Sequence, residues 1–179
     1  MATTGGRRKP ATLAAQALGW LDPATRAVAP PLHLTTNYAR DAAYGVAGGR
    51  TYIRDNNPVY EQLEALLCEL ECGAASHVFA SGMAAATTAF YALAPGDHVV
   101  APSEMYFGLR NWLEQVGRHW GLAVDFVPPG DLDALAAAVR PGTTKLVWIE
   151  TPSNPTWTIT DIAAAAEIAH AAGARLGVD

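Results

Sequence analysis

From residue 59 to the end of the chain, short apolar runs alternate with segments whose apolar residues recur at helical spacing. The helical spacing predicts helices over residues 59–70, 82–93, 105–120, 131–139 and 160–172. The apolar runs predict five strands: Ser76–Ala80, His98–Ala101, Ala123–Val127, Lys145–Ile149 and Ala174–Val178. Strands that alternate with helices in this way are typical of an α/β fold, a mainly parallel sheet with helices on both faces.

The first 58 residues lack this alternation, because prolines interrupt the pattern. Only residues 12–19 could form a short helix, and residues 44–58 are rich in Gly, Asn and Pro, as in a loop. Asn57 and Pro58 are a favourable N-cap and first residue for the helix that follows. We therefore expect an extended N-terminal arm over residues 1–58 and a core domain over residues 59–179.

Composition narrows the classes of partner. The 179 residues are 50% hydrophobic and 16% charged, with a net charge of −5, and no basic face indicates nucleic acid binding. No apolar run is long enough for a membrane span or a signal peptide, so we expect a cytoplasmic protein without a membrane partner. Cys68 and Cys72 fall in a leucine-rich helical pattern and are expected to be buried, and the five histidines fit no ligand spacing, so no metal site is predicted.

The segment Ser81-Gly82-Met83 joins the first predicted strand to an Ala-rich helix. A serine in this place is most often only an N-cap. The same corner can also bind phosphate, because the first N–H groups of a helix lack partners and carry the positive end of its dipole. The segment alone leaves both interpretations open.

Polar residues also follow the other strands: Ser103-Glu104-Met105-Tyr106, then the segment Glu150–Pro155, and finally Asp179. Ligands of open α/β sheets bind beyond the carboxyl ends of the strands. An anion site, an aromatic ring, an amide and a carboxylate together suit a flat, phosphorylated, nitrogen-containing ring such as pyridoxal 5′-phosphate (PLP). A dinucleotide would need more glycines at the turn, so another nucleotide-binding α/β module is the weaker alternative.

Five motifs, in this order, resemble those of the Cys/Met-metabolism family of PLP-dependent enzymes, which includes cystathionine γ-synthase, cystathionine γ-lyase and methionine γ-lyase. They are Thr51-Tyr52-Ile53-Arg54 with Asn57-Pro58, Ala80–Ala85, Tyr106 with Gly108, Glu150–Thr156, and Gly177-Val178-Asp179. The resemblance implies the large domain of a fold type I PLP-dependent transferase, of which this chain is the N-terminal, truncated part.

The resemblance also implies roles for individual residues. Backbone N–H groups of Gly82 and Met83 would bind the cofactor phosphate, with Ser81 also in the cofactor site, and Tyr52 and Arg54 would reach the same phosphate from a neighbouring subunit. Tyr106 would stack on the ring and assist proton transfer as a catalytic residue. Asn154 would contact the ring's 3-oxygen and the substrate carboxylate, and Asp179 would pair with the ring nitrogen. A homo-oligomer is then expected, either a dimer or a homotetramer built as a dimer of dimers.

The implied reaction is elimination or replacement at Cγ or Cβ of a sulfur-containing or homoserine-type amino acid. The family's Schiff-base lysine lies downstream of the residue that corresponds to Asp179, and the only lysines here are Lys9 and Lys145. We therefore expect a fragment, or one part of a split enzyme that a C-terminal chain completes. A non-catalytic subunit that completes another chain's active site is the alternative.

Two positions depart from the family pattern. Phe107 stands where the family usually has Gly, and Val59 where Thr is common. A bulky ring next to Tyr106 is expected to narrow the substrate pocket.

Overall fold

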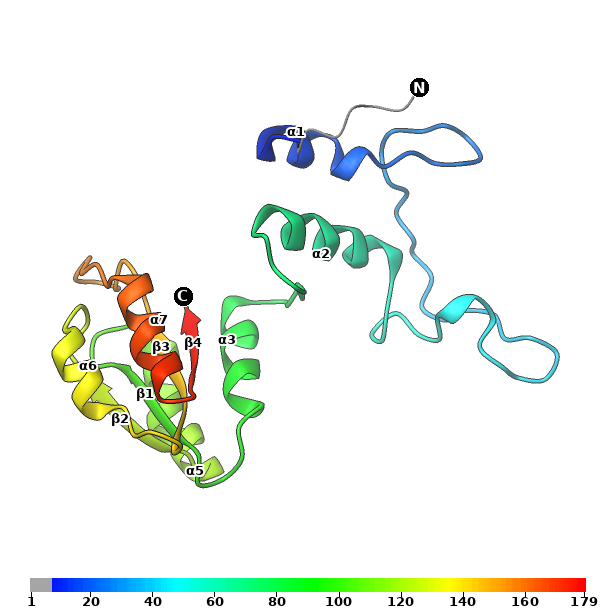
Figure 1. Cartoon of the computed structure of the whole chain (residues 1–179). Helices are drawn as coiled ribbons and strands as arrows, with labels where there is room; N and C mark the ends of the chain where they lie inside the picture. The colour runs from blue at the N-terminus through cyan, green and yellow to red at the C-terminus, as the bar shows by residue number, and fades with distance from the viewer. Residues whose placement is uncertain (1–7) are drawn as a thin grey trace. The chain divides into compact units, whose positions relative to one another are not determined.

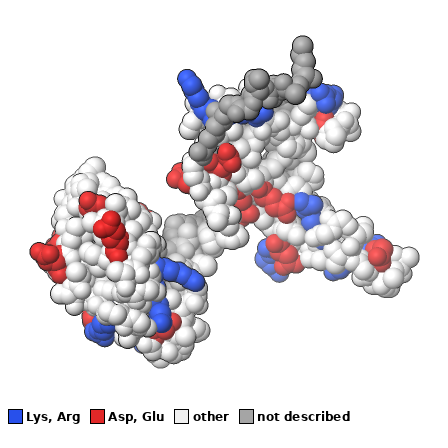
Figure 2. Space-filling model, viewed as in Figure 1, with Lys and Arg blue, Asp and Glu red and all other residues white. Residues whose placement is uncertain are grey.

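The computed structural model describes residues 8–179 and divides the chain into two compact units. The first unit ends at Val78, and the second runs from Phe79 to Asp179. Figure 1 shows the elements of both units. Charged side chains of both signs are interspersed on the face of each unit that Figure 2 shows.

The second unit contains a four-stranded sheet in the order β2-β1-β3-β4, and every neighbouring pair is parallel. This confirms the predicted parallel sheet and α/β class. The strands are β1 (His98–Pro102), β2 (Ala123–Val127), β3 (Thr144–Ile149) and β4 (Arg175–Val178). The helices are α3 (Gly82–Tyr91), α4 (Phe107–Trp112), η3 (Leu113–Gly117), α5 (Arg118–Trp120), α6 (Leu132–Ala138) and α7 (Ile162–Ala171).

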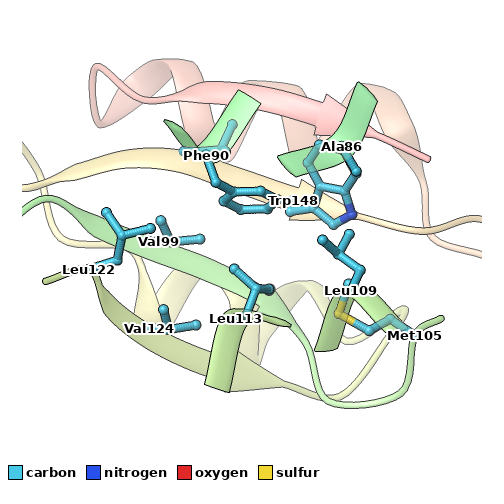
Figure 3. Close-up of a cluster of buried hydrophobic side chains, with 11 residues drawn as sticks. Ala86, Phe90, Val99, Met105, Leu109, Leu113, Leu122, Val124 and Trp148 are labelled. Carbon is cyan, nitrogen blue, oxygen red and sulfur yellow. The ribbon is translucent and has the colours of Figure 1, made fainter. Parts of the chain in front are cut away.

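Alternate residues of the central strands point to opposite faces, and each face is covered by helices, as predicted. Val99 of β1 and Trp148 of β3 pack with residues of α3, α4 and η3. In that cluster the rings of Phe90 and Trp148 lie 5.1 Å apart between centroids (Figure 3). Val100 and Val147 pack on the other face against α6 and α7. Burial on both faces explains why Val99–Ala101 of β1 and Leu146–Ile149 of β3 are apolar without alternation.

The strand predicted over Ser76–Ala80 is not formed, so the sheet has four strands and not five. The backbone N–H of Val78 donates instead to the Glu64 carboxylate, 2.9 Å away, and Phe79 is 39% exposed. No strand among residues 8–179 pairs with this segment. An apolar run forms a strand only when the edge of another strand is available to it.

A buried histidine lies at the amino-terminal edge of the sheet. His98 is 1% exposed, with Nδ1 lying 2.8 Å from Thr144 Oγ1 and Nε2 lying 3.2 Å from Asp125 Oδ2. Lys145 lies at this same edge, where its Nζ donates to the Gly142 carbonyl at 2.7 Å. These two bonds give His98 a structural role. Within residues 8–179, no group of three or more Asp, Glu, Cys or His side chains could hold a metal ion.

The first unit is mostly irregular and contains α1 (Pro10–Ala15), η1 (Ala17–Gly19), η2 (Ala47–Gly49) and α2 (Pro58–Leu70). Asn57 caps α2, since its side chain accepts from the Val59 N–H. Helix α2 packs on α1 and η1 and belongs with them to the first compact unit, which ends at Val78. The expected burial of Cys72 is wrong: α2 has ended before it, and its side chain is exposed. Over the described residues, no helix is long and apolar enough to cross a membrane.

Candidate active site

Ser81 caps α3, which supports the simpler of the two interpretations of this corner. Its Oγ accepts from the Ala84 N–H at 3.1 Å. The N–H groups of Gly82 and Met83 have no acceptor among the hydrogen bonds of residues 8–179. A Cβ placed on Gly82 would have no heavy atom within 4 Å, so the backbone is open to a ligand on that side. The cap and a vacant pair of N–H donors therefore coexist.

Tyr106 follows β1 and precedes α4, and its ring lies against the backbone of Gly108. A Cβ on Gly108 would come within 2.7 Å of Tyr106 Cε1 and 3.0 Å of its Cζ. The ring is half-exposed, and the Tyr106 N–H donates to the Glu150 carboxylate at 2.7 Å. Glycine at residue 108 thus allows the aromatic ring to occupy this position.

Glu150 joins the two loops that carry Tyr106 and Asn154. One carboxylate oxygen accepts from the Tyr106 N–H, and the other accepts from the Asn154 N–H at 2.6 Å. Glu150 is 6% exposed. The sequence motifs assigned no role to Glu150. A carboxylate directly after an apolar strand was the available signal, because a buried charge requires hydrogen-bond partners.

Asp179 continues the pairing of β4 with β3 beyond the strand. Its N–H donates to the Ile149 carbonyl at 2.9 Å, and its own carbonyl accepts from the Thr151 N–H at 3.1 Å. The backbone on both sides of the carboxylate is therefore fixed to the sheet, while the residue itself is exposed.

These groups surround one cavity of about 620 Å³ at the carboxyl edge of the sheet. Five of the residues predicted for the site line it: Ser81, Gly82, Met83, Tyr106 and Asp179. The other lining residues are Ala86, Leu109, Glu150, Thr151 and Pro152. The second unit thus brings a pair of vacant N–H donors, an aromatic ring and a carboxylate to the same space.

Asn154 does not line this cavity. It lies on an adjoining hollow of about 340 Å³, which shares Pro152 with the cavity and is also lined by Ser153, Pro155 and Trp157. Only its backbone is tied to the site, through Glu150.

Tyr52 and Arg54 belong to the first unit, where they form a pair. The Arg54 Nη1 donates to the Tyr52 hydroxyl at 3.0 Å, and the guanidinium carbon lies 4.4 Å from the centre of the tyrosine ring. The structure thus brings these two side chains together within the first unit.

The expectation that Phe107 narrows the pocket is wrong for this cavity. Phe107 is 78% exposed and lines a separate hollow with Arg110, Asn111 and Glu114. Helix α4 begins at Phe107, so its side chain leaves the backbone in a different direction from that of Tyr106, the N-cap. Adjacent residues of a helix do not share a face.

Comparison with known proteins gives a consistent result. The sequence profile of the family described as "Cys/Met metabolism PLP-dependent enzyme" matches residues 11–179. The cystathionine gamma-synthase of Mycobacterium tuberculosis is 43% identical over 171 residues, which are 95% of this chain and 44% of that protein. The cystathionine gamma-lyase of Mus musculus is 39% identical over 149 residues, or 83% of this chain and 37% of that protein.

Solved structures agree with the sequence matches. The crystal structure of metB from Corynebacterium glutamicum has a TM-score of 0.89 at 33% identity, covering 96% of this chain and 45% of that one. The cystathionine gamma-lyase CalE6 of Micromonospora echinospora has a TM-score of 0.86 at 35% identity, covering 97% of this chain and 45% of that one. The chain thus spans less than half the length of these relatives.

Proposed function

The chain belongs to the Cys/Met-metabolism family of PLP-dependent enzymes, and on that premise we propose that it takes part in elimination or replacement at Cγ or Cβ of a sulfur-containing or homoserine-type amino acid. The relatives named above as cystathionine gamma-synthase and gamma-lyase support this substrate class. The observation that carries the proposal is the cavity at the carboxyl edge of the sheet, because its lining offers N–H donors for the phosphate of PLP, an aromatic ring for stacking and a carboxylate for the ring nitrogen.

The phosphate fits the start of α3. Two vacant N–H donors at Gly82 and Met83 and the positive end of a ten-residue helix favour an anion there. Ser81 keeps the helix start in place through its bond to the Ala84 N–H. The open space around Gly82 lets the phosphate approach the backbone closely.

The ring would be held by Tyr106 and Asp179, which both line the cavity. An aromatic face provides a stacking surface, and a carboxylate favours the protonated form of a ring nitrogen beside it. When PLP is bound, it supplies an electron sink for negative charge that develops on the substrate. Tyr106 is the residue that we propose to assist proton transfer, since its hydroxyl belongs to a half-exposed ring on the cavity wall.

Asn154 and the pair Tyr52–Arg54 complete the proposed site. The Asn154 amide is proposed to contact the cofactor's 3-oxygen and the substrate carboxylate, and the shared wall at Pro152 places the two hollows next to each other. Tyr52 and Arg54 are proposed to bind the phosphate of a second copy of the chain in a dimer or a dimer of dimers. The planar guanidinium can pair with two phosphate oxygens at once.

The lysine that such a cofactor requires is not found at the cavity. Lys145 lies at the opposite edge of the sheet and is bonded to Gly142, and Lys9 belongs to the first unit. We propose that the amine comes from a polypeptide segment outside these 179 residues, either in a longer form of the protein or in a complementing chain. The position of Lys145 is also what supports the second candidate, a subunit that completes another chain's active site.

Binding of PLP and of pyridoxal, which lacks the phosphate, tests the proposal. The wild-type chain should bind PLP more tightly than pyridoxal, as measured by absorbance and fluorescence titration. Gly82→Pro removes one phosphate donor at the first helical position, where proline is tolerated, and Ser81 already has the extended backbone that proline requires before it.

The Gly82→Pro variant should lose roughly tenfold in PLP affinity, as expected for one hydrogen bond to a charged group, and keep its affinity for pyridoxal. Equal affinity of the wild-type chain for both ligands would refute the phosphate site. Borohydride reduction followed by peptide mapping tests the source of the amine, and a stoichiometric adduct on Lys145 or Lys9 would disprove the proposal of an external lysine.

A further inference from the structure

The segment that carries Tyr52 and Arg54 is held on one side by a short antiparallel contact. Asn37 pairs with Tyr52, the Ile53 N–H donates to the Thr36 carbonyl at 2.9 Å, and the Tyr38 N–H donates to the Thr51 carbonyl at 3.3 Å. These bonds fix the backbone N–H of Ile53, the residue between the two side chains. The Ile53 carbonyl takes no part in these bonds and accepts a hydrogen bond from a different residue.

That partner is Tyr60, on the first turn of α2. Its hydroxyl donates to the Ile53 carbonyl at 3.1 Å. The turn is itself anchored, because the capping residue Asn57 is 2% exposed and its Nδ2 donates to the His33 carbonyl at 3.4 Å. Both backbone groups of Ile53 are therefore hydrogen-bonded. Its N–H donates to the Thr36 carbonyl, and its carbonyl accepts from Tyr60 at the start of a capped helix.

The surroundings of Tyr60 favour a hydroxyl that keeps its proton. Burial, together with the nearby carboxylates of Glu61, Glu64 and Asp55, raises the pKa of Tyr60 above its ordinary value. Glu61 is engaged by Arg50 in an ion pair and does not compete for the hydroxyl. Tyr60 is thus a stable donor to Ile53, and among residues 8–179 its side chain makes no other hydrogen bond.

We propose that Tyr60 is a positioning residue for phosphate binding: by holding the Ile53 carbonyl, it sets the place from which Tyr52 and Arg54 meet the cofactor phosphate. The inference rests on the proposed function, in which this pair binds phosphate. Arg54 is exposed, and a long exposed side chain loses rotamer freedom when it binds a ligand. A backbone fixed on both sides, with the guanidinium already bonded to Tyr52, reduces that loss.

The test compares PLP with pyridoxal in the full 179-residue chain. Tyr60→Phe removes the hydroxyl and keeps the ring, and it should weaken PLP binding roughly fivefold, as expected for one hydrogen bond. Pyridoxal binding should not change. Tyr44→Phe is the matched control, because it makes the same chemical change in the same unit at a residue that is 86% exposed, and it should alter neither affinity.

Arg54→Ala, introduced both into the wild-type chain and into the Tyr60→Phe variant, separates the inference from the proposed function. If Tyr60 acts through this pair, Tyr60→Phe has no further effect on PLP affinity once Arg54 is replaced. A fivefold effect that persists in the Arg54→Ala background, or one that is equal for pyridoxal, would mean that Tyr60 only stabilises the unit. A loss of PLP affinity in Arg54→Ala without one in Tyr60→Phe would overturn the inference alone. No loss of PLP affinity in Arg54→Ala would overturn both the inference and the phosphate role of Arg54.

Discussion

Replacing Gly108 with alanine should separate cofactor binding from stability. Gly108 is the second residue of α4 and does not have a positive φ, so alanine can adopt its backbone conformation. The new Cβ would lie 2.7 Å from Tyr106 Cε1, whereas ordinary contact begins at 3.4 Å. The tyrosine ring must therefore move by at least 0.7 Å, the difference between these two distances.

The substitution should affect stability and PLP affinity in opposite directions. Glycine to alanine at a compatible site stabilises a protein by about 0.4–1 kcal/mol through the unfolded chain, and the half-exposed ring has room to move. Stability should then be unchanged or slightly higher. An aromatic pair contributes about 0.5–1.5 kcal/mol beyond its buried area, so a displaced Tyr106 should weaken PLP binding by roughly threefold to tenfold.

Fluorescence titration with PLP and thermal unfolding of the same samples measure both quantities. Gly117→Ala is the matched control, because Gly117 is also helical and its added Cβ would be in ordinary contact, 3.6 Å from Leu113 and Trp112 side-chain atoms. It should leave PLP affinity unchanged. If Gly108→Ala binds PLP as tightly as the wild-type chain, Tyr106 does not stack on the cofactor from the position described.

Two further substitutions test the carboxylate that bonds the cavity loops and the hydrophobic core beneath α3. Glu150→Ala leaves the N–H groups of Tyr106 and Asn154 without their carboxylate acceptor, and it should cost about 2–4 kcal/mol of unfolding free energy and weaken PLP binding; urea unfolding at wild-type stability would contradict this. Phe90→Ala removes a ring that is 0% exposed and should cost about 3–5 kcal/mol, whereas Thr88→Ala on the exposed side of α3 should cost far less in the same urea measurement.

The regular elements of the second unit could be predicted because local signals and tertiary structure agree there. Strand β2 covers the predicted residues, Ala123–Val127, and β1 and β3 differ from prediction by one residue at one end. Each is a short, mostly apolar run bounded by turn residues, the usual sign of a strand in a parallel sheet. The post-strand residues of three segments converge on one cavity for the same reason, since parallel strands end at a common edge.

Side-chain direction and long-range bonds could not be predicted in this way. Glu150 accepts from residue 106, 44 positions away, and no local pattern shows which donor a buried carboxylate will meet. Phe107 was expected to face the cavity because it follows Tyr106, but the start of α4 turns it outward. Tyr60 fell within an ordinary amphipathic pattern, and only the fold of the loop reveals its bond to Ile53.

The segment Ser76–Ala80 shows where a local signal is insufficient. Its apolar, partly β-branched residues resemble those of β1, and both segments precede polar residues at the start of a turn. The difference lies in hydrogen bonding: β1 is paired on both sides, by β2 and β3, whereas the Val78 N–H is satisfied by the Glu64 side chain. A backbone donor needs one partner, and a side chain within reach can replace a strand. The start of α3 keeps its cap and its vacant N–H pair without a preceding strand, because the capping bond is local and runs from the Ala84 N–H to the Ser81 side chain.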